Sequence, residues 1–230
     1  MNDLTGQVVL ITGANGGLGA SVTQTFLKAG ATVVGSSRVI SETQFPHPNF
    51  YGVPADLSDG AAAGQLAGRV LEKHGRIDSL VHLVGGFAGG QAIHETSDET
   101  WHAMMNLNVL AAVHMFRAVI PHMRKAGRGR IVAVGSRAGI EPAGGIAAYA
   151  ASKAALISLA RTAMLENRDA RITVNVILPG TIDTEANRAL DPRGSSEWIS
   201  PGRIAELAVL LVSDAGSQIN GAAIPVYGFQ

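Results

Sequence analysis

The sequence has no cysteine among its 230 residues, which excludes disulfides, thiolate nucleophiles and cysteine-ligated metal sites. An excess of one charge is also missing, because 18 basic and 18 acidic residues cancel and give no electrostatic basis for a nucleic-acid or membrane partner. The start of the chain lacks the features of a secretory signal, and no run of about 18 apolar residues could span a bilayer. We therefore expect a cytoplasmic protein with no metal site that binds neither nucleic acid nor membranes.

Aromatic residues are scarce, at 5 % of the chain, whereas glycine is abundant, with 28 residues. Short apolar runs alternate with longer stretches of helical periodicity, as a doubly wound α/β sheet requires. The sequence predicts one Rossmann-type domain over residues 1–230, with a mostly or wholly parallel sheet and helices on both faces. The predicted strands lie at 8–11, 31–34, 77–84, 130–134 and 172–178, and the main helices at 18–29, 97–125, 147–167 and 201–212.

Two segments, 39–51 and 181–200, lack clear periodicity. Loops of about twenty residues inside compact domains are usually functional. We therefore expect the second segment to cover a substrate.

A glycine-rich segment, 12–19, follows the first predicted strand directly and opens a helix. In that context Gly13 permits a tight turn, Gly17 lets a diphosphate approach the backbone, and Gly19 lets the helix pack closely on the strand. Glycine clusters also form ordinary turns, which is the alternative for the motif taken alone. The candidate dinucleotide-binding residues of this segment are Gly13, Asn15, Gly16, Gly17, Leu18 and Gly19.

Tyr149 and Lys153 are four residues apart on a predicted helix and so share one face of it. An ammonium group near a phenol favours the phenolate, which a tyrosine needs for acid–base work because its ordinary pKa is about 10. An isolated pair of this kind would more simply be a surface tyrosine and lysine.

The sequence resembles the short-chain dehydrogenase/reductase family over essentially its whole length. The segment 12–19 is similar to that family's TGxxxGxG motif, Tyr149 and Lys153 to its YxxxK motif, and 175–180 to its NxxxPG segment. The resemblance implies a catalytic tetrad of Asn108, Ser136, Tyr149 and Lys153. In the family, the tyrosine exchanges the proton and the serine binds the substrate oxygen. The lysine binds the nicotinamide ribose and lowers the tyrosine pKa, and the asparagine kinks its helix and holds a water.

Further cofactor contacts follow from the same resemblance. They are Asp56 and Leu57 near the adenine, Gly85 after the next strand, and Pro179, Gly180, Ile182 and Thr184 near the nicotinamide. An aspartate at position 56 could equally cap a helix that begins near Ser58. Ser37 and Arg38 end the second strand without an acid, which favours NADP(H). NAD(H) stays possible, because Gly16 stands where NADP-dependent relatives often carry a basic residue.

The family's usual NNAG segment is replaced here by 82–85, in which His82 is expected to be a core histidine. The segments 85–90 and 183–188 look similar to the dihydropteridine reductase branch, whereas Ser136 and Asn108 are typical of ordinary carbonyl reductases. We expect an NAD(P)-dependent oxidoreductase that moves hydride between nicotinamide and a small-molecule carbonyl or alcohol. The alternatives are a quinonoid dihydropteridine reductase-like enzyme and a non-catalytic dinucleotide sensor.

Phe87 and Trp198 are the expected substrate contacts. The helices at 97–125 and 147–167 have apolar coverage wider than one buried stripe, including Met115 and Phe116. They are therefore expected to form the interface of a homo-oligomer, with a tetramer favoured.

Overall fold

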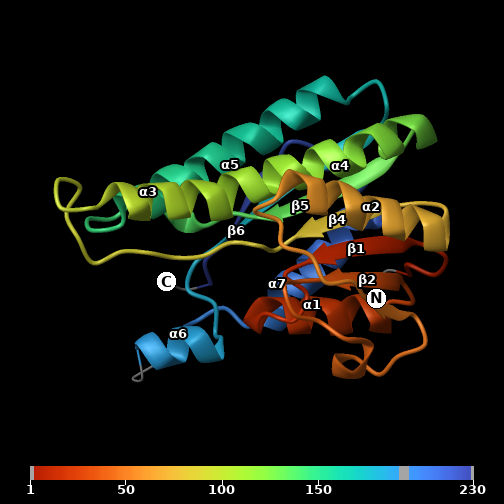
Figure 1. The fold of residues 1–230 in the computed structure, drawn as a ribbon, viewed down its shortest axis with the longest axis horizontal. Helices are drawn as coiled ribbons and strands as arrows, with labels where there is room; N and C mark the ends of the chain where they lie inside the picture. Colours follow the sequence, from red (N-terminus) through yellow and green to blue (C-terminus); the bar gives the residue numbers. More distant parts are fainter. Residues whose placement is uncertain (1–2, 192–196, 229–230) are drawn as a thin grey trace.

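The computed structural model describes residues 3–191 and 197–228, which form a seven-stranded sheet covered by helices on both faces (Figure 1). All neighbouring strands in this sheet pair in parallel. The strand order is β3-β2-β1-β4-β5-β6-β7, which confirms the predicted doubly wound Rossmann-type fold. The strands are β1 (Val8–Thr12), β2 (Thr32–Ser36), β3 (Phe50–Gly52), β4 (Ser79–His82), β5 (Gly129–Val134), β6 (Ile172–Pro179) and β7 (Ala223–Val226).

The apolar runs form strands because both of their faces are buried. In β1, Leu10 points into the core cluster that includes β4 and β5 residues such as Leu80 and Ile131, while Ile11 points into the cluster on the other face. β1 pairs with β2 on one side and with β4 on the other. The chain therefore adds strands in one direction from β1 and, after β3, in the opposite direction from β4, so the strand order reverses between β1 and β4. Ligands of open parallel sheets bind at the carboxyl ends of the strands at such a point.

Helices cover the two faces unequally (Figure 1). α1 (Gly17–Lys28) and α7 (Pro201–Val212) pack on one face, while α2 (Gly60–His74), α4 (Ala111–Ala126) and α5 (Ala147–Glu166) pack on the other. Asp59 caps α2 by accepting a hydrogen bond from the backbone of Ala61, and Gly75 ends it in the left-handed conformation.

The predicted helix at 97–125 consists of three continuous parts: α3 (Asp98–Met105), the π-helical turn η2 (Asn106–Leu110) and α4. Segment Asp98–Ala126 is long and apolar enough to cross a membrane by length and composition, with a mean hydropathy of 1.4 and a window that is 39 % buried. The sequence analysis expected no such segment. A core helix passes the same test, and α4 buries Met115, Phe116 and Val119 in the core cluster shared with the sheet. Met115 and Phe116 are therefore core residues and offer no surface for an interface, contrary to expectation.

Several short elements lie outside the predicted ones, including the 3-10 turns η3 (Arg137–Gly139) and η4 (Asp214–Gly216). β3 and the 3-10 turn η1 (Glu42–Gln44) occupy the segment 39–51, and β7 forms the far edge of the sheet. The expected substrate loop contains α6 (Glu185–Leu190), and its two ends are joined by a bridge between Ile182 and Ile199. Residues 192–196 of that loop lie outside the described residues.

Candidate functional site

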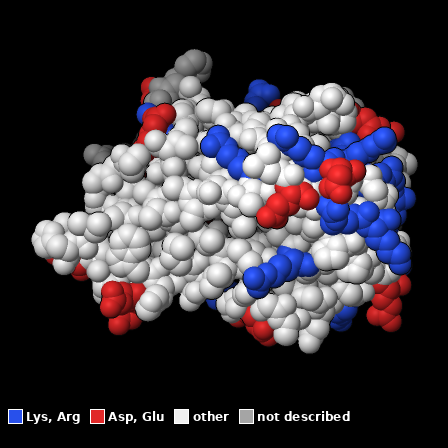
Figure 2. Space-filling model, turned by 90° about the horizontal axis from the view of Figure 1, so that it is seen from above, with Lys and Arg blue, Asp and Glu red and all other residues white. Residues whose placement is uncertain are grey.

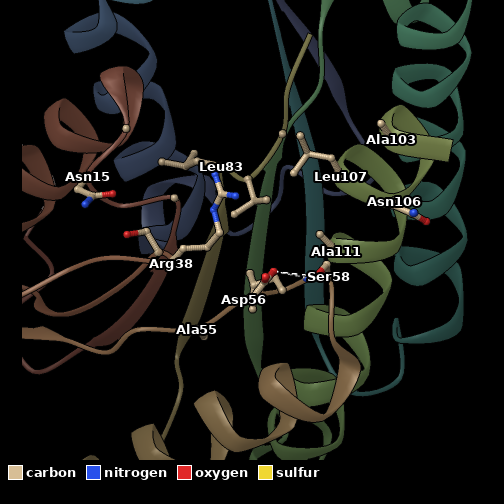
Figure 3. Close-up of a pocket in the computed structure, with 16 residues that line it drawn as sticks. Asn15, Arg38, Ala55, Asp56, Ser58, Leu83, Ala103, Asn106, Leu107 and Ala111 are labelled. Carbon is tan, nitrogen blue, oxygen red and sulfur yellow. Dashed lines mark hydrogen bonds between the residues drawn. The ribbon is translucent and has the colours of Figure 1, made fainter. Parts of the chain in front are cut away.

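A cavity of about 560 Å³ opens at the carboxyl ends of β1, β2 and β4, where the fold predicts a ligand (Figure 3). Its walls come from the glycine-rich turn after β1, the ends of β2 and β3, the segment after β4, and the helix formed by α3, η2 and α4. The residues that line it are Gly13, Asn15, Gly16, Ser37, Arg38, Ala55, Asp56, Leu57, Ser58, Leu83, Val84, Gly85, Ala103, Asn106, Leu107 and Ala111.

The glycine-rich turn leaves no room for side chains at two positions. Gly13 has a φ of +72°, which favours glycine, and a Cβ atom at Gly19 would overlap the carbonyl oxygen of Gly13. The first turn of α1 therefore packs directly on the end of β1. Gly16 and Gly17 are exposed. This cradle fits a diphosphate at a helix N-terminus.

Arg38 and Asp56 face each other across one end of the cavity (Figure 3). Hydrogen bonds from the backbone and hydroxyl of Ser58 hold the pKa of Asp56 below its ordinary value, and the nearby Arg38 lowers it further. Sequence analysis allowed Asp56 to be either an adenine contact or the N-cap of the next helix. The N-cap of α2 is Asp59, so Asp56 is not the cap. Ser37 donates its hydroxyl hydrogen bond to the carbonyl of Val39. The Arg38 side chain projects into the cavity.

Two side chains hold the segments of the cavity wall together. The amide of Asn15 donates to the carbonyl of Val39 at 2.6 Å and so ties the glycine-rich turn to the segment after β2. Nδ1 of His114, on α4, lies 2.9 Å from the carbonyl oxygen of Leu57 and must donate, because a carbonyl only accepts. The loop that carries Asp56 is therefore fixed to α4.

The predicted acid–base residues lie together beyond the cavity, after the C-terminal end of β5 and near the N-terminal end of α5. Ser136 follows β5, accepts a hydrogen bond from the backbone of Ala138 at 3.2 Å, and lies close enough to Tyr149, at the start of α5, to lower its pKa. Lys153, one turn along α5, is buried, and its ammonium donates to the carbonyl of Val134 at 3.0 Å and lies 5.9 Å from the Tyr149 ring centroid. The structure thus brings three of the four tetrad residues together.

Burial dominates the ionisation of this pair. Burial raises the pKa of Tyr149, and the hydrogen bond with Ser136 opposes that rise. Burial lowers the pKa of Lys153 to about 8. The net direction for the tyrosine is opposite to the one the family resemblance implies, because desolvation outweighs the stabilising contacts present in this structure.

Asn108, the fourth tetrad residue, sits inside the π-helical turn η2 and is fully buried. Its amide donates to the carbonyl of Gly86 at 3.1 Å and to the hydroxyl of Ser152 at 3.0 Å, and its oxygen accepts from the backbone of Gly86 at 2.9 Å. A π turn breaks the regular helix locally, as the resemblance implied for this residue. Asn108 therefore ties the segment after β4 to α5.

The residues predicted near the nicotinamide follow the end of β6 and do not line the cavity. Gly180 donates to Val226, and Thr184, the cap of α6, lies against the position where Gly17 would carry a Cβ atom. Pro179 ends β6, and Ile182 takes part in the bridge with Ile199. Leu18 belongs to α1. Of the residues predicted near the nicotinamide, Thr184 therefore lies against the glycine-rich turn, at Gly17.

The two expected substrate contacts have different surroundings. The ring of Phe87 packs edge-on against that of Tyr149, with 5.0 Å between centroids. Trp198 is half-buried at the end of the loop that carries α6. Phe87 is thus placed beside the acid–base group, whereas for Trp198 the structure supplies no such contact.

Sequence reasoning missed half of the cavity wall. Leu83 and Val84 could have been found, since they lie between the strand and Gly85. The missed lining residues on α3, η2 and α4 could not have been found, because their spacing is the ordinary spacing of residues on one face of a helix. The missed lining residues are Ala55, Ser58, Leu83, Val84, Ala103, Asn106, Leu107 and Ala111.

Comparisons with known proteins agree with this geometry. Residues 7–194 match the family described as short chain dehydrogenase. The 3-oxoacyl-[acyl-carrier-protein] reductase FabG of Escherichia coli is 31 % identical over 97 % of this chain and 96 % of its own. Two solved structures superpose with a TM-score of 0.90 each. One is a 3-ketoacyl-(acyl-carrier-protein) reductase from Brucella melitensis complexed with NADH, 29 % identical over 99 % of both chains. The other is the Pseudomonas aeruginosa RhlG/NADP active-site complex, 32 % identical over 99 % of this chain and 97 % of that one. By sequence and by fold, the chain belongs to the short-chain dehydrogenase/reductase family of NAD(P)-dependent enzymes that act on alcohol and carbonyl groups.

Proposed function

We propose that the protein is a carbonyl reductase in which Tyr149 is the general acid–base. The observation that carries this proposal is that Tyr149 lies within reach of the Ser136 side chain and has the buried ammonium of Lys153 5.9 Å from its ring centroid. A carbonyl oxygen that takes both hydroxyls as donors would be polarised as charge develops on it. The raised pKa of Tyr149 keeps the phenol protonated near neutrality, which suits reduction.

The remaining residues of the site bind and orient. The bound nicotinamide supplies or accepts the hydride. Gly13, Gly17 and Gly19 form the cradle for its diphosphate, and Asp56 and Leu57 flank the adenine end of the cavity. Lys153 would bind the nicotinamide ribose and stabilise the phenolate that remains after Tyr149 gives its proton.

Within the same proposal, NADP(H) is the preferred cofactor. Arg38 and Ser37 line the cavity at the end of β2, where a ribose 2′-phosphate would need a cation and a hydroxyl. The acid nearest to Arg38 that also lines the cavity is Asp56, which two hydrogen bonds from Ser58 hold in place. NAD(H) use is the competing outcome.

Two other functions share this fold. The segment 85–90 resembles the dihydropteridine reductase branch and places Phe87 on Tyr149, so quinonoid pterins belong in any substrate panel. A non-catalytic dinucleotide sensor would bind cofactor without turnover, and the tetrad argues against it.

The direct test is Tyr149→Phe. The variant should bind NADPH as the wild type does but lose at least about 100-fold in kcat, because only the transferable proton is removed. Fluorescence titration gives the cofactor Kd, and stopped-flow oxidation of NADPH with a ketone panel gives turnover. Reduction at a near-wild-type rate would show that another group is the acid.

A further inference from the structure

Phe87 presents an aromatic ring to the space above the acid–base residues. One edge of the ring contacts Tyr149, while 58 % of the residue is exposed. The exposed part of the ring is apolar surface on which the ring of a bound molecule could pack. A molecule packed on this part of Phe87 would lie next to Tyr149, where the proposed reaction takes place.

Close backbone contacts hold Phe87 in this position. A Cβ atom at Gly86 would meet the side chain of Leu107, and a Cβ atom at Gly89 would lie 2.7 Å from Ile146 and 2.9 Å from Phe87 itself. The backbone on both sides of Phe87 thus packs tightly against η2 and against the residue that precedes α5. The ring is presented by a fixed loop segment.

The loop that carries Phe87, residues 86–91, has no charged side chain. A small cavity of about 70 Å³ beside this loop is lined by uncharged residues, including Ala88, Gly89 and Ile146. Arg137, which follows Ser136 in the chain, pairs with Glu141 at 2.7 Å. In Figure 2 the Lys and Arg side chains of the visible face gather toward one end of the molecule, while Asp and Glu side chains lie at both ends.

We infer that the substrate is an uncharged ketone, or the matching secondary alcohol, with an aromatic ring next to the reacting carbon. The inference rests on the proposed function. The substrate ring would pack against the exposed part of Phe87 while its carbonyl oxygen takes the hydroxyl donors of Ser136 and Tyr149. Reduction adds a hydride from NAD(P)H to the carbonyl carbon and the Tyr149 proton to the oxygen, which gives the alcohol and NAD(P)⁺.

The test compares three methyl ketones: acetophenone, its saturated analogue cyclohexyl methyl ketone, and the anionic 4-acetylbenzoate. The wild type should prefer them in that order by kcat/KM. In Phe87→Leu, which keeps an apolar side chain, the ratio of acetophenone to the cyclohexyl ketone should fall by about 2- to 12-fold, the size of an aromatic pair contribution. Ile93→Ala removes an exposed apolar side chain from the same connecting segment and should leave the ratio unchanged.

Binding supplies a readout independent of turnover. Calorimetric titration of the protein–NADP⁺ complex with acetophenone, which cannot react with the oxidised cofactor, should give a Kd that rises in Phe87→Leu but stays constant in Ile93→Ala. An unchanged ketone ratio or an unchanged Kd in Phe87→Leu would overturn the inference. If no ketone reacts although NADPH binds, the proposed function fails, and the calorimetric comparison still decides whether Phe87 holds an aromatic ring.

Discussion

The hydroxyl of Thr12 and Nδ1 of His82 lie 2.9 Å apart and join the last residues of β1 and β4. Thr12 precedes Gly13 and His82 precedes Leu83, so this hydrogen bond fixes two neighbouring segments that both line the cavity. The imidazole is 1 % exposed, and burial, assisted by the charge of Lys153, lowers its pKa to about 3. His82 is therefore a neutral core residue, as its sequence position suggested.

This histidine should make the protein sensitive to acid. The unfolded chain takes up a proton at His82 near pH 6.5, but the folded chain takes it up only near pH 3, so the unfolded state binds more protons between these values. The free energy of unfolding therefore falls as the pH drops below 6.5. At pH 4.5 the loss from this group is about 2 to 3 kcal/mol.

Urea denaturation of His82→Asn at pH 7 and pH 4.5 measures that loss. The difference in unfolding free energy between the two pH values should shrink by about 2 kcal/mol relative to the wild type. His94→Asn, at an exposed histidine, is the matched control and should keep the wild-type difference. If the unfolding free energy changed equally between pH 7 and pH 4.5 in the wild type and both variants, His82 would not be the group responsible for the acid sensitivity.

Reduction should slow above about pH 8. Lys153, with a pKa of about 8, loses its ammonium charge as the pH rises through that value. The charge stabilises the Tyr149 phenolate formed when the proton is given away, so kcat/KM for reduction should fall in the alkaline range. Lys153→Arg keeps a charge at all these pH values, and any activity it retains should not fall until higher pH. A wild-type profile that stays flat to pH 10 would contradict this role.

Cofactor preference should shift when the end of β2 is changed. Ser37→Asp combined with Arg38→Ala removes the proposed phosphate partner and adds repulsion, so the NADPH/NADH ratio of kcat/KM should fall by about 10- to 100-fold. Arg161→Ala removes an exposed arginine from α5 and should leave the ratio unchanged. A wild type that already prefers NADH strongly would disprove the interpretation of Ser37 and Arg38.

Alanine should have opposite effects at two helical glycines. In Gly19→Ala the new Cβ would overlap the Gly13 carbonyl, so the unfolding free energy should drop by about 1 to 3 kcal/mol. In Gly64→Ala, on α2, the Cβ meets nothing within 4 Å, so helix propensity alone should raise that free energy by about 1 kcal/mol. Urea denaturation of both variants provides the comparison. A gain in Gly19→Ala would show that the turn is looser than described.

The protein should form a homo-oligomer, with a tetramer favoured. Exposed apolar side chains, including Leu107, Leu110 and Leu165, lie on the helical segments predicted to pair. Light scattering at micromolar concentration should give a multiple of 23.8 kDa. A mass close to the single-chain value would exclude the assembly.

The sequence predicted β1, β2, β4, β5 and β6 because a strand buried on both faces is a nearly continuous apolar run. β7, which has four residues like β4, was missed because it is only partly buried and contains Pro225, which an edge strand tolerates. The run at 77–84 overestimated β4, since Leu83 and Val84 are apolar for another reason: they line the cavity.

The site was predictable where chemistry demands particular residue types at strand ends. Gly13, Ser136 and Gly180 follow different strands, and parallel strands bring their carboxyl ends to one edge of the sheet. The contribution of α3 and η2 was not predictable, because Ala103 and Leu107 belong to the cavity only through the tertiary position of their helix.

The π-helical turn η2 makes the chain sensitive to its length at one place. A π turn holds one residue more than an α turn, so deleting a single residue within Asn106–Leu110 would allow an uninterrupted α-helix. A π turn accommodates its extra residue locally, so α3 and α4 would keep their orientations relative to each other. Asn108 would leave Gly86 and Ser152, while the core contacts of α4 would stay in register. A one-residue deletion here would therefore disconnect the asparagine of the tetrad from a sheet and helices that stay folded.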